Sequence, residues 1–175
     1  MLSSICIGAH ITAAPDASRQ VLDCLRRIVQ LLRESSRRAE QQLGISGAQL
    51  FVLETLAESP HQSLNEVAAR TRTHQSSVSI VVARLVERGL VARQRAAGDA
   101  RRLELALTAR GRRLTKASPA AVQHRLVRAI EDLPPRSRRQ LATLLCRIAT
   151  GMDAIDHPPR MFFDDDRRKA PRRNA

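Results

Sequence analysis

The stretch SLNEVAARTRTHQSSVSIVVARLVERGLVARQRAAGDARRLELALTARG, residues 63–111, decides how this chain folds. It begins with a capping box, because the Ser63 hydroxyl can accept a hydrogen bond from the amide of Glu66 while the glutamate side chain reaches back. A turn at residues 71–74 separates this short helix from another helix that we expect from about Gln75 to Arg88. Apolar residues at helical spacing give that helix a buried face. The start of the stretch therefore predicts two short helices joined by a tight turn.

After these helices the pattern becomes that of strands. Leucine occupies every second position from Leu103 to Leu107, which is the period of a half-buried strand. We expect strands at residues 90–95 and 102–107, joined by a turn at 96–101. Two short helices followed by an arginine-rich hairpin have the order of a winged helix-turn-helix, a fold that mostly serves to hold duplex DNA.

The N-terminal flank also favours helices. Apolar residues at helical spacing predict a long first helix over residues 17–43, which Gly44 ends as a glycine past the last turn. Ser46 can cap a second helix over residues 47–58. Residues 1–16 show no such periodicity, and we interpret them as a flexible arm.

The C-terminal flank continues the helical pattern. Thr108 can cap a helix that runs toward Asp132 with a kink at Pro119, and a last helix starts near Ser137. From residue 157 onward prolines and a charge run replace any periodicity, so we expect a disordered tail. The fold class is therefore mainly α with a small β-hairpin wing.

The charge of the chain points to a polyanionic partner. Its 30 lysines and arginines outnumber 17 acidic residues, and the formal net charge is +13. Such a field favours nucleic acid first and an anionic membrane second, although an arginine-biased composition with no special partner is the alternative. Because aromatic residues make up only 2% of the chain, the core must be aliphatic.

Several classes of protein are disfavoured by the sequence. No apolar stretch is long enough for a signal peptide or a membrane span, so we expect a cytoplasmic protein with no membrane partner. The three cysteines and five histidines show no metal-ligand spacing, and we expect neither a metal nor a cofactor. The chain lacks a glycine-rich phosphate loop, a nucleophile elbow and an HExxH motif, so we do not expect an enzyme.

The second helix of the quoted stretch has the two faces that a recognition helix needs. Its polar residues are Gln75, Ser76, Ser77 and Ser79. Glutamine can make a bidentate contact to adenine, serine can bond bases or phosphates, and the amides of a helix start favour a phosphate. His74 can meet a phosphate or simply cap the helix, and Ser63 is a further candidate for a DNA contact. The alternative for this cluster is an ordinary solvated helix start.

The hairpin tip carries candidate minor-groove contacts. Four arginines flank the tip, Arg93, Arg95, Arg101 and Arg102, and a narrow minor groove attracts inserted arginine. Asp99 lies two residues before Arg101, and we expect it to hold that guanidinium by a bidentate pair, because a lone carboxylate would repel DNA. A basic hairpin on its own is more often a solvated edge, but its place after a two-helix turn favours a wing.

Three motifs carry a resemblance to a known family. LVERGLV at 85–91, the Asp99-x-Arg101 pair and LTARG at 107–111 resemble the MarR family of dimeric winged-helix transcription regulators. The resemblance covers roughly residues 21–152. It implies that residues 75–79 lie in the major groove, that Arg101 enters the minor groove, and that the terminal helices intertwine into a dimer.

The chain departs from the family pattern at two places. Ile80 stands where the family often has arginine or another polar residue, which can alter base readout. Thr71-Arg72-Thr73 replaces the usual turn of the Leu-Gly-Val type, which affects the turn boundaries and not the fold.

A dimer also follows from the amount of apolar surface. The terminal helices carry more leucine, isoleucine and valine than one small lobe can hide, although a monomer with these helices folded on its own core is the alternative. A two-fold dimer would set two recognition helices about one duplex turn apart, matching a pseudo-palindromic operator.

We expect the chain to have three parts: an arm at 1–16, a MarR-type domain at 17–156 and a disordered tail at 157–175. Within the domain, we expect a DNA-binding lobe at about 46–111 and dimerisation helices at about 17–43 and 108–153.

The resemblance also raises the question of what the protein senses. Many relatives are released from DNA by a small, often aromatic, anion bound between the DNA lobe and the dimer lobe. A thiol sensor that uses Cys24 is a second hypothesis, although a buried structural cysteine is the simpler interpretation of that residue. The rival from another class is a non-specific basic scaffold that binds nucleic acid.

Overall fold

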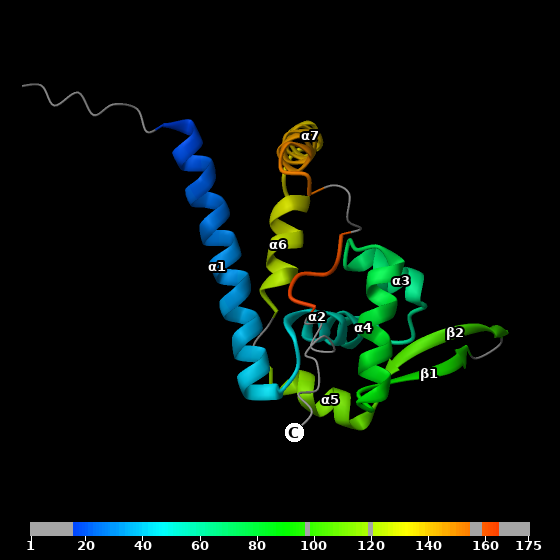
Figure 1. Cartoon of the computed structure of the whole chain (residues 1–175). Helices are drawn as coiled ribbons and strands as arrows, with labels where there is room; N and C mark the ends of the chain where they lie inside the picture. The colour runs from blue at the N-terminus through cyan, green and yellow to red at the C-terminus, as the bar shows by residue number, and fades with distance from the viewer. Residues whose placement is uncertain (1–15, 97–98, 119–120, 155–158, 165–175) are drawn as a thin grey trace, which may run out of the picture.

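The computed structural model describes residues 16–96, 99–118, 121–154 and 159–164, without the side chains of residues 99–101. Helices form most of it, and one antiparallel hairpin projects from a helical lobe (Figure 1). In chain order the elements are α1 (Ala17–Leu43), α2 (Gly47–Glu58), α3 (Leu64–Arg70), α4 (Gln75–Glu87), β1 (Val91–Ala96), β2 (Asp99–Leu107), α5 (Ala109–Lys116), α6 (Val122–Glu131) and α7 (Pro135–Gly151). The predicted bounds of α1 and α2 are confirmed.

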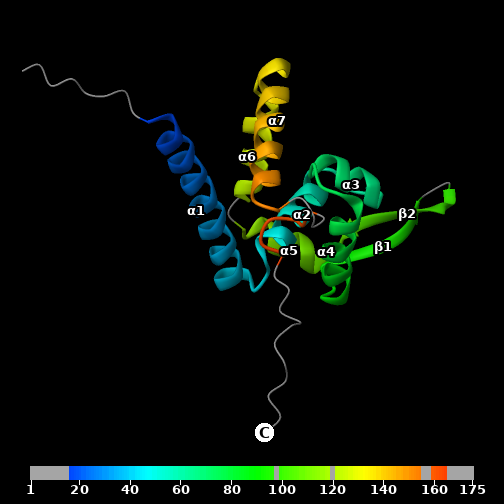
Figure 2. The ribbon, with the colours of Figure 1, turned by 45° about the horizontal axis from the view of Figure 1, so that its top comes forward.

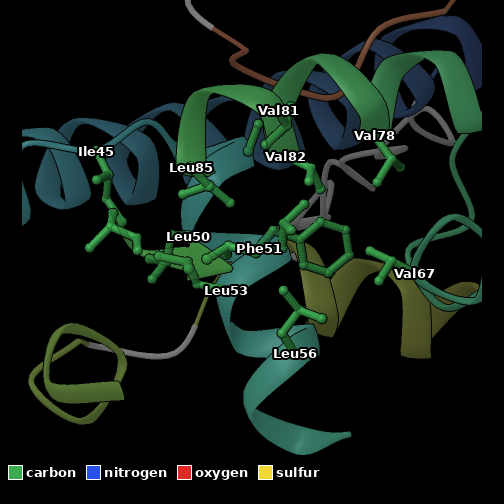
Figure 3. Close-up of a cluster of buried hydrophobic side chains, with 14 of the residues drawn as sticks. Ile45, Leu50, Phe51, Leu53, Leu56, Val67, Val78, Val81, Val82 and Leu85 are labelled. Atoms are coloured by element: carbon green, nitrogen blue, oxygen red, sulfur yellow. The ribbon is translucent and has the colours of Figure 1, made fainter. Parts of the chain in front are cut away.

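The core of the lobe surrounds α2. Apolar side chains at the consecutive positions 50–53 point in all directions around this helix, and all of them are buried. Figure 3 shows Leu50, Phe51 and Leu53 in one cluster with Val81 and Leu85 of α4 and Val67 of α3. Burying one such side chain contributes about 1.5–3 kcal/mol to stability, so this contact fixes α3 and α4 on α2.

Serine caps set where the helices begin. The Ser46 hydroxyl accepts a hydrogen bond from the Gln49 amide at 3.2 Å, and the Gln49 side chain accepts one from the Ser46 amide at 3.0 Å. The capping box predicted for α3 is present as well, with the Glu66 amide donating to Ser63 Oγ at 3.3 Å. Each box satisfies two amides that a helix start leaves without partners.

The hairpin reaches farther toward its tip than the sequence predicts. The two strands pair from Val91 with Leu107 up to Ala96 with Asp99, so the expected turn at 96–101 and the strand start at Arg102 are wrong. Backbone pairing past a bulge at Arg95/Ala96 lengthens the ladder. The amide of Leu105 also donates to the Gln62 carbonyl at 2.7 Å, which fastens β2 to the loop before α3.

The helix expected from Thr108 to Asp132 is two helices. α5 ends at Lys116 and α6 begins at Val122. Proline cannot donate a backbone hydrogen bond and disfavours helical geometry in the residue before it, so Pro119 separates two helices and does not merely kink one. The last helix begins at Pro135, two residues before Ser137, because proline suits the first position of a helix.

The tail is another correction to the expectation from sequence. Residues 159–164 pack on the lobe, and Met161 is only 5% exposed within the same cluster as the α2 side chains. A buried side chain and several polar contacts order a segment whose sequence has no periodicity. Residues 1–15 of the arm predicted at 1–16, and residues 157–158 and 165–175 of the tail predicted at 157–175, lie outside the described residues.

The terminal helices flank the lobe on the side away from the hairpin. Figure 1 and Figure 2 both show α1 on one side of the lobe and the hairpin projecting on the opposite side. None of the helices in the described parts of the chain is both long enough and apolar enough to cross a membrane.

Gly111, in the first turn of α5, makes the closest approach between the hairpin base and a helix. A Cβ at this position would lie 2.1 Å from the Leu90 carbonyl oxygen, and that oxygen already accepts a hydrogen bond from the Thr108 amide. We expect Gly111→Ala to lower the free energy of unfolding by roughly 1–3 kcal/mol, measured by urea denaturation. Gly151→Ala is the control, because a Cβ there meets no atom within 4 Å. Equal stability of the two variants would contradict the packing argument.

Candidate nucleic-acid interface

Helix α4 presents a polar N-terminal turn to solvent. Val78, Val81, Val82 and Leu85 are buried against the lobe. Gln75 and Ser76 are exposed and Ser79 is half-buried, as a recognition helix requires. Ile80 is 47% exposed on the same side, so an apolar side chain lies within this polar face.

Ser77 does not share that face. It is 6% exposed, and its hydroxyl donates a hydrogen bond to the Pro159 carbonyl oxygen at 2.8 Å. Successive residues of a helix are turned by about 100°, which brings Ser77 onto the flank toward the C-terminal segment. The prediction that Ser77 is presented for a DNA contact is therefore wrong for this arrangement.

His74 is the N-cap residue of α4, but its side chain makes no capping hydrogen bond. The predicted capping position is therefore confirmed, but the side chain itself does not cap the helix. Its ring is exposed next to Gln75, at the end of the helix where unpaired amides and the helix dipole favour an anion.

The wing is fastened to α3 by an ion pair that the sequence analysis did not predict. Arg102 Nη2 lies 3.0 Å from both carboxylate oxygens of Glu66. The Ser63 hydroxyl also donates to that carboxylate at 2.7 Å. The pKa of Glu66 is lowered, first by the hydrogen bonds from Ser63 and then by the charge of Arg102. Ser63 and Arg102, predicted as DNA contacts, therefore already bind Glu66.

The remaining wing residues are Arg95, which is exposed on β1, and the Asp99–Arg101 pair. The backbone places Asp99 and Arg101 at the start of β2. Their side chains lie outside the described residues, so the brace between them stays a prediction.

A part-buried polar contact joins the lobe to α6. The Glu54 carboxylate of α2 accepts a hydrogen bond from the Ala121 amide, at 3.0 and 2.9 Å. Ala121 is the N-cap residue of α6 and has no side chain that could cap the helix, so Glu54 provides a polar partner at this helix start. The His124 ring packs edge-on against Phe51, with centroids 4.5 Å apart. Burial raises the pKa of Glu54 and lowers the pKa of His124. The sequence signal for this link is Glu54 itself, a charged residue within the otherwise apolar middle of α2.

A second link joins the turn before α4 to the same helix. The Arg72 guanidinium pairs with the Glu131 carboxylate, with Nε 2.7 Å from Oε1. Arg72 has a φ of 52°, a left-handed conformation that few residues other than glycine adopt. The unusual turn Thr71-Arg72-Thr73 therefore contacts α6 as well as joining α3 to α4.

Metal and thiol candidates find limited support. No group of three or more histidine, cysteine or acidic side chains within the described ranges is placed to hold a metal ion. Cys24 and Cys146 are both exposed free thiols, so the interpretation of Cys24 as a buried structural residue is wrong for the single chain.

His124 makes the stability of the link between lobe and α6 depend on pH. Its pKa in the folded chain lies below the usual 6.5, so the stability it contributes is present above pH 6.5 and is lost as the pH falls through the folded-state value. We expect the urea midpoint to fall further between about pH 7.5 and about pH 5.5 in the wild type than in His124→Gln, which has no titrating ring. The same pH dependence in both proteins would contradict this assignment.

Together the turn between α3 and α4, the polar start of α4 and the basic hairpin define a winged helix-turn-helix protein. Residues 43–102 match the model of the MarR family. The HTH-type transcriptional repressor Rv2887 of Mycobacterium tuberculosis is 29% identical over 126 residues, which cover 72% of this chain and 91% of that protein. The HTH-type transcriptional repressor MdtR of Bacillus subtilis is 30% identical over 87 residues, which cover 50% of this chain and 56% of that protein.

Solved structures show the same fold. BpsR of Bordetella bronchiseptica, whose DNA binding is regulated by 6-hydroxynicotinic acid, superposes with a TM-score of 0.51 at 23% identity, covering 77% of this chain and 94% of that one. The transcriptional regulator BldR of Sulfolobus solfataricus superposes with a TM-score of 0.50 at 22% identity, covering 74% and 95%. The segment of this chain that is similar to the MarR family of transcription regulators is thus residues 43–102.

Proposed function

We propose that this protein is a homodimeric, sequence-specific DNA-binding repressor. The observation that carries the proposal is the pairing of two surfaces on one chain. One is the exposed polar start of α4 beside a basic hairpin, and the other is a set of terminal helices whose apolar side chains are exposed in the single protomer. The first suits a DNA groove, and the second suits a second copy.

Base recognition is assigned to Gln75, Ser76 and Ser79, which α4 holds outward. Arg95 and Arg101 would enter the minor groove, with Asp99 holding Arg101 in place. Arg102 acts differently, because its pair with Glu66 fixes the orientation of the hairpin relative to α3. The wing therefore divides its arginines between contacting DNA and holding the hairpin.

Replacement of Arg101 tests the wing. We expect Arg101→Ala to weaken binding to a duplex from the region upstream of its own gene by about 1–3 kcal/mol and to reduce the salt dependence by about one phosphate contact. Arg139→Ala removes the same charge from the exposed surface of α7 and should leave binding within error. Fluorescence anisotropy at several salt concentrations provides the comparison. Unchanged affinity in Arg101→Ala would remove this residue from the interface.

The dimer surface is assigned to α1 and α7. Helix α7 has no buried residue, although leucines and an isoleucine form a stripe along one side. The stripe consists of Leu141, Leu144, Leu145, Ile148 and Met152. Helix α1 exposes a similar set toward its N-terminal end, beginning with Val21 and Leu22. Monomeric proteins rarely leave so much contiguous apolar surface in water, so a second copy is the natural cover.

A charge on the α7 stripe tests the dimer. We expect Leu145→Glu to give a particle of monomer mass in sedimentation or light scattering at low micromolar concentration, because an unpaired buried carboxylate is costly. Thr143→Glu adds the same charge to the same helix on the side away from the stripe and should remain a dimer. A wild type of monomer mass would contradict the proposed assembly.

A cleft between the lobe and α6 suits a small effector. It encloses about 300 Å³ and is lined by Phe51 of α2, the turn before α4, Leu126 and Ile130 of α6, and the C-terminal segment. Apolar walls with Arg72 and His74 at the turn fit an aromatic anion. Because the cleft borders both α6 and the turn that ends at His74, the N-cap residue of α4, its occupant can bias the spacing of the two helices.

Two other functions remain as alternatives. Cys24 is exposed on α1, which is the single observation that favours a thiol sensor. A non-specific nucleic-acid scaffold would bind any duplex equally, whereas a repressor prefers its operator at a salt concentration that suppresses non-specific binding.

A further inference from the structure

Residues 159–164 lie along one flank of the recognition helix. In Figure 1 this segment, drawn in orange-red, runs between α6 and α4. Its Met161 side chain is 5% exposed and belongs to the buried cluster around α2, whereas the neighbouring Phe162 is 54% exposed. One side chain therefore anchors the segment in the lobe.

Polar contacts attach the segment to two helices at once. On α4, the Ser77 hydroxyl donates to the Pro159 carbonyl oxygen at 2.8 Å, and Arg84 forms an ion pair with Asp164. On α6, Gln123 Nε2 donates to the Phe162 carbonyl oxygen at 3.2 Å. Ser77 and Arg84 are seven residues apart, so they lie on the same side of α4, two turns from each other.

These contacts change what α4 can offer to DNA. The Ser77 hydroxyl has one hydrogen, and the segment takes it. The Asp164 carboxylate offsets the charge of Arg84, whose side chain is only 21% exposed, and so weakens the attraction of the helix for a phosphate. The contact with Gln123 also fixes α4 relative to α6.

We propose that residues 159–164 are an autoinhibitory segment that binds the recognition helix and must leave it before DNA is bound tightly. The inference rests on the proposed DNA-binding function and adds its regulation. The segment and DNA compete for Ser77 and for the flank of α4 that carries Arg84. Release of the segment also frees α4 from α6, so the lobe can adjust to the spacing of the operator.

The test loosens the segment without changing α4. We expect Met161→Ser to bind the upstream duplex about tenfold more tightly than the wild type in anisotropy titrations, because the anchor is lost. Phe162→Ser is the matched control, since that side chain is exposed and the contact to Gln123 uses only the backbone. Hydrogen exchange of the peptide that contains residues 159–164 should become faster in Met161→Ser and remain unchanged in the control.

A second pair of variants tests the charge. Asp164→Asn should tighten binding, and the gain should shrink at high salt, because screening weakens the ion pair with Arg84. Asp153→Asn makes the same change in net charge at an exposed residue whose φ of 54° asparagine tolerates. A gain in Asp164→Asn that Asp153→Asn reproduces would show only a general charge effect and would overturn the proposal.

The outcomes separate this inference from the proposed function. If the wild type prefers the upstream duplex over a scrambled one but Met161→Ser binds it no more tightly, autoinhibition is overturned and the repressor stands. If neither protein prefers the upstream duplex, the repressor itself fails and the inhibition fails with it. If only Met161→Ser shows the preference, both proposals are supported.

Discussion

The structure depends on the burial of the apolar side chains of α2 at positions 50–53 and 56. Because apolar side chains point outward all around this helix, each neighbouring element must pack an apolar face against it. Helices α3 and α4 cover one part, and the base of the hairpin and α5 cover another. The orientation of the recognition helix and the position of the wing are thus consequences of one packing constraint, and neither is set by local sequence alone.

The connection between the lobe and α6 is of a different kind. Apart from the packing of Ala121 and Val127 on the core, it consists of a carboxylate that accepts the amide at the start of α6, an aromatic edge contact and the pair of Arg72 with Glu131. Such contacts are directional and few, whereas the α2 core is apolar and continuous. The core of the lobe can therefore stay intact while its angle to α6 changes.

Sequence reasoning predicted the elements that local rules determine. The cap at Ser46, the capping box at Ser63 and the alternating leucines of β2 have short-range signatures, and the structure contains them. Contacts between distant residues were not predictable in this way. Arg102 has no local sign that it pairs with Glu66, and nothing near Met161 indicates that a core 110 residues earlier in the sequence, around Phe51, accepts it. Ser77 was misassigned for the same reason, because its hydrogen-bond partner is 82 residues away.

The exposed helix α7 has a consequence for how the protein is maintained. An isolated helix of 17 residues is only marginally stable in water, and α7 gains no buried side chain from its own protomer. If a second copy covers it, folding of this helix and association become one equilibrium, governed by protomer concentration. At low concentration, α7 would then be unfolded and accessible to proteases more of the time. A small fall in synthesis would therefore be amplified, because the remaining protein would be degraded faster. The abundance of the protein would itself respond steeply, as a threshold, to expression of its gene.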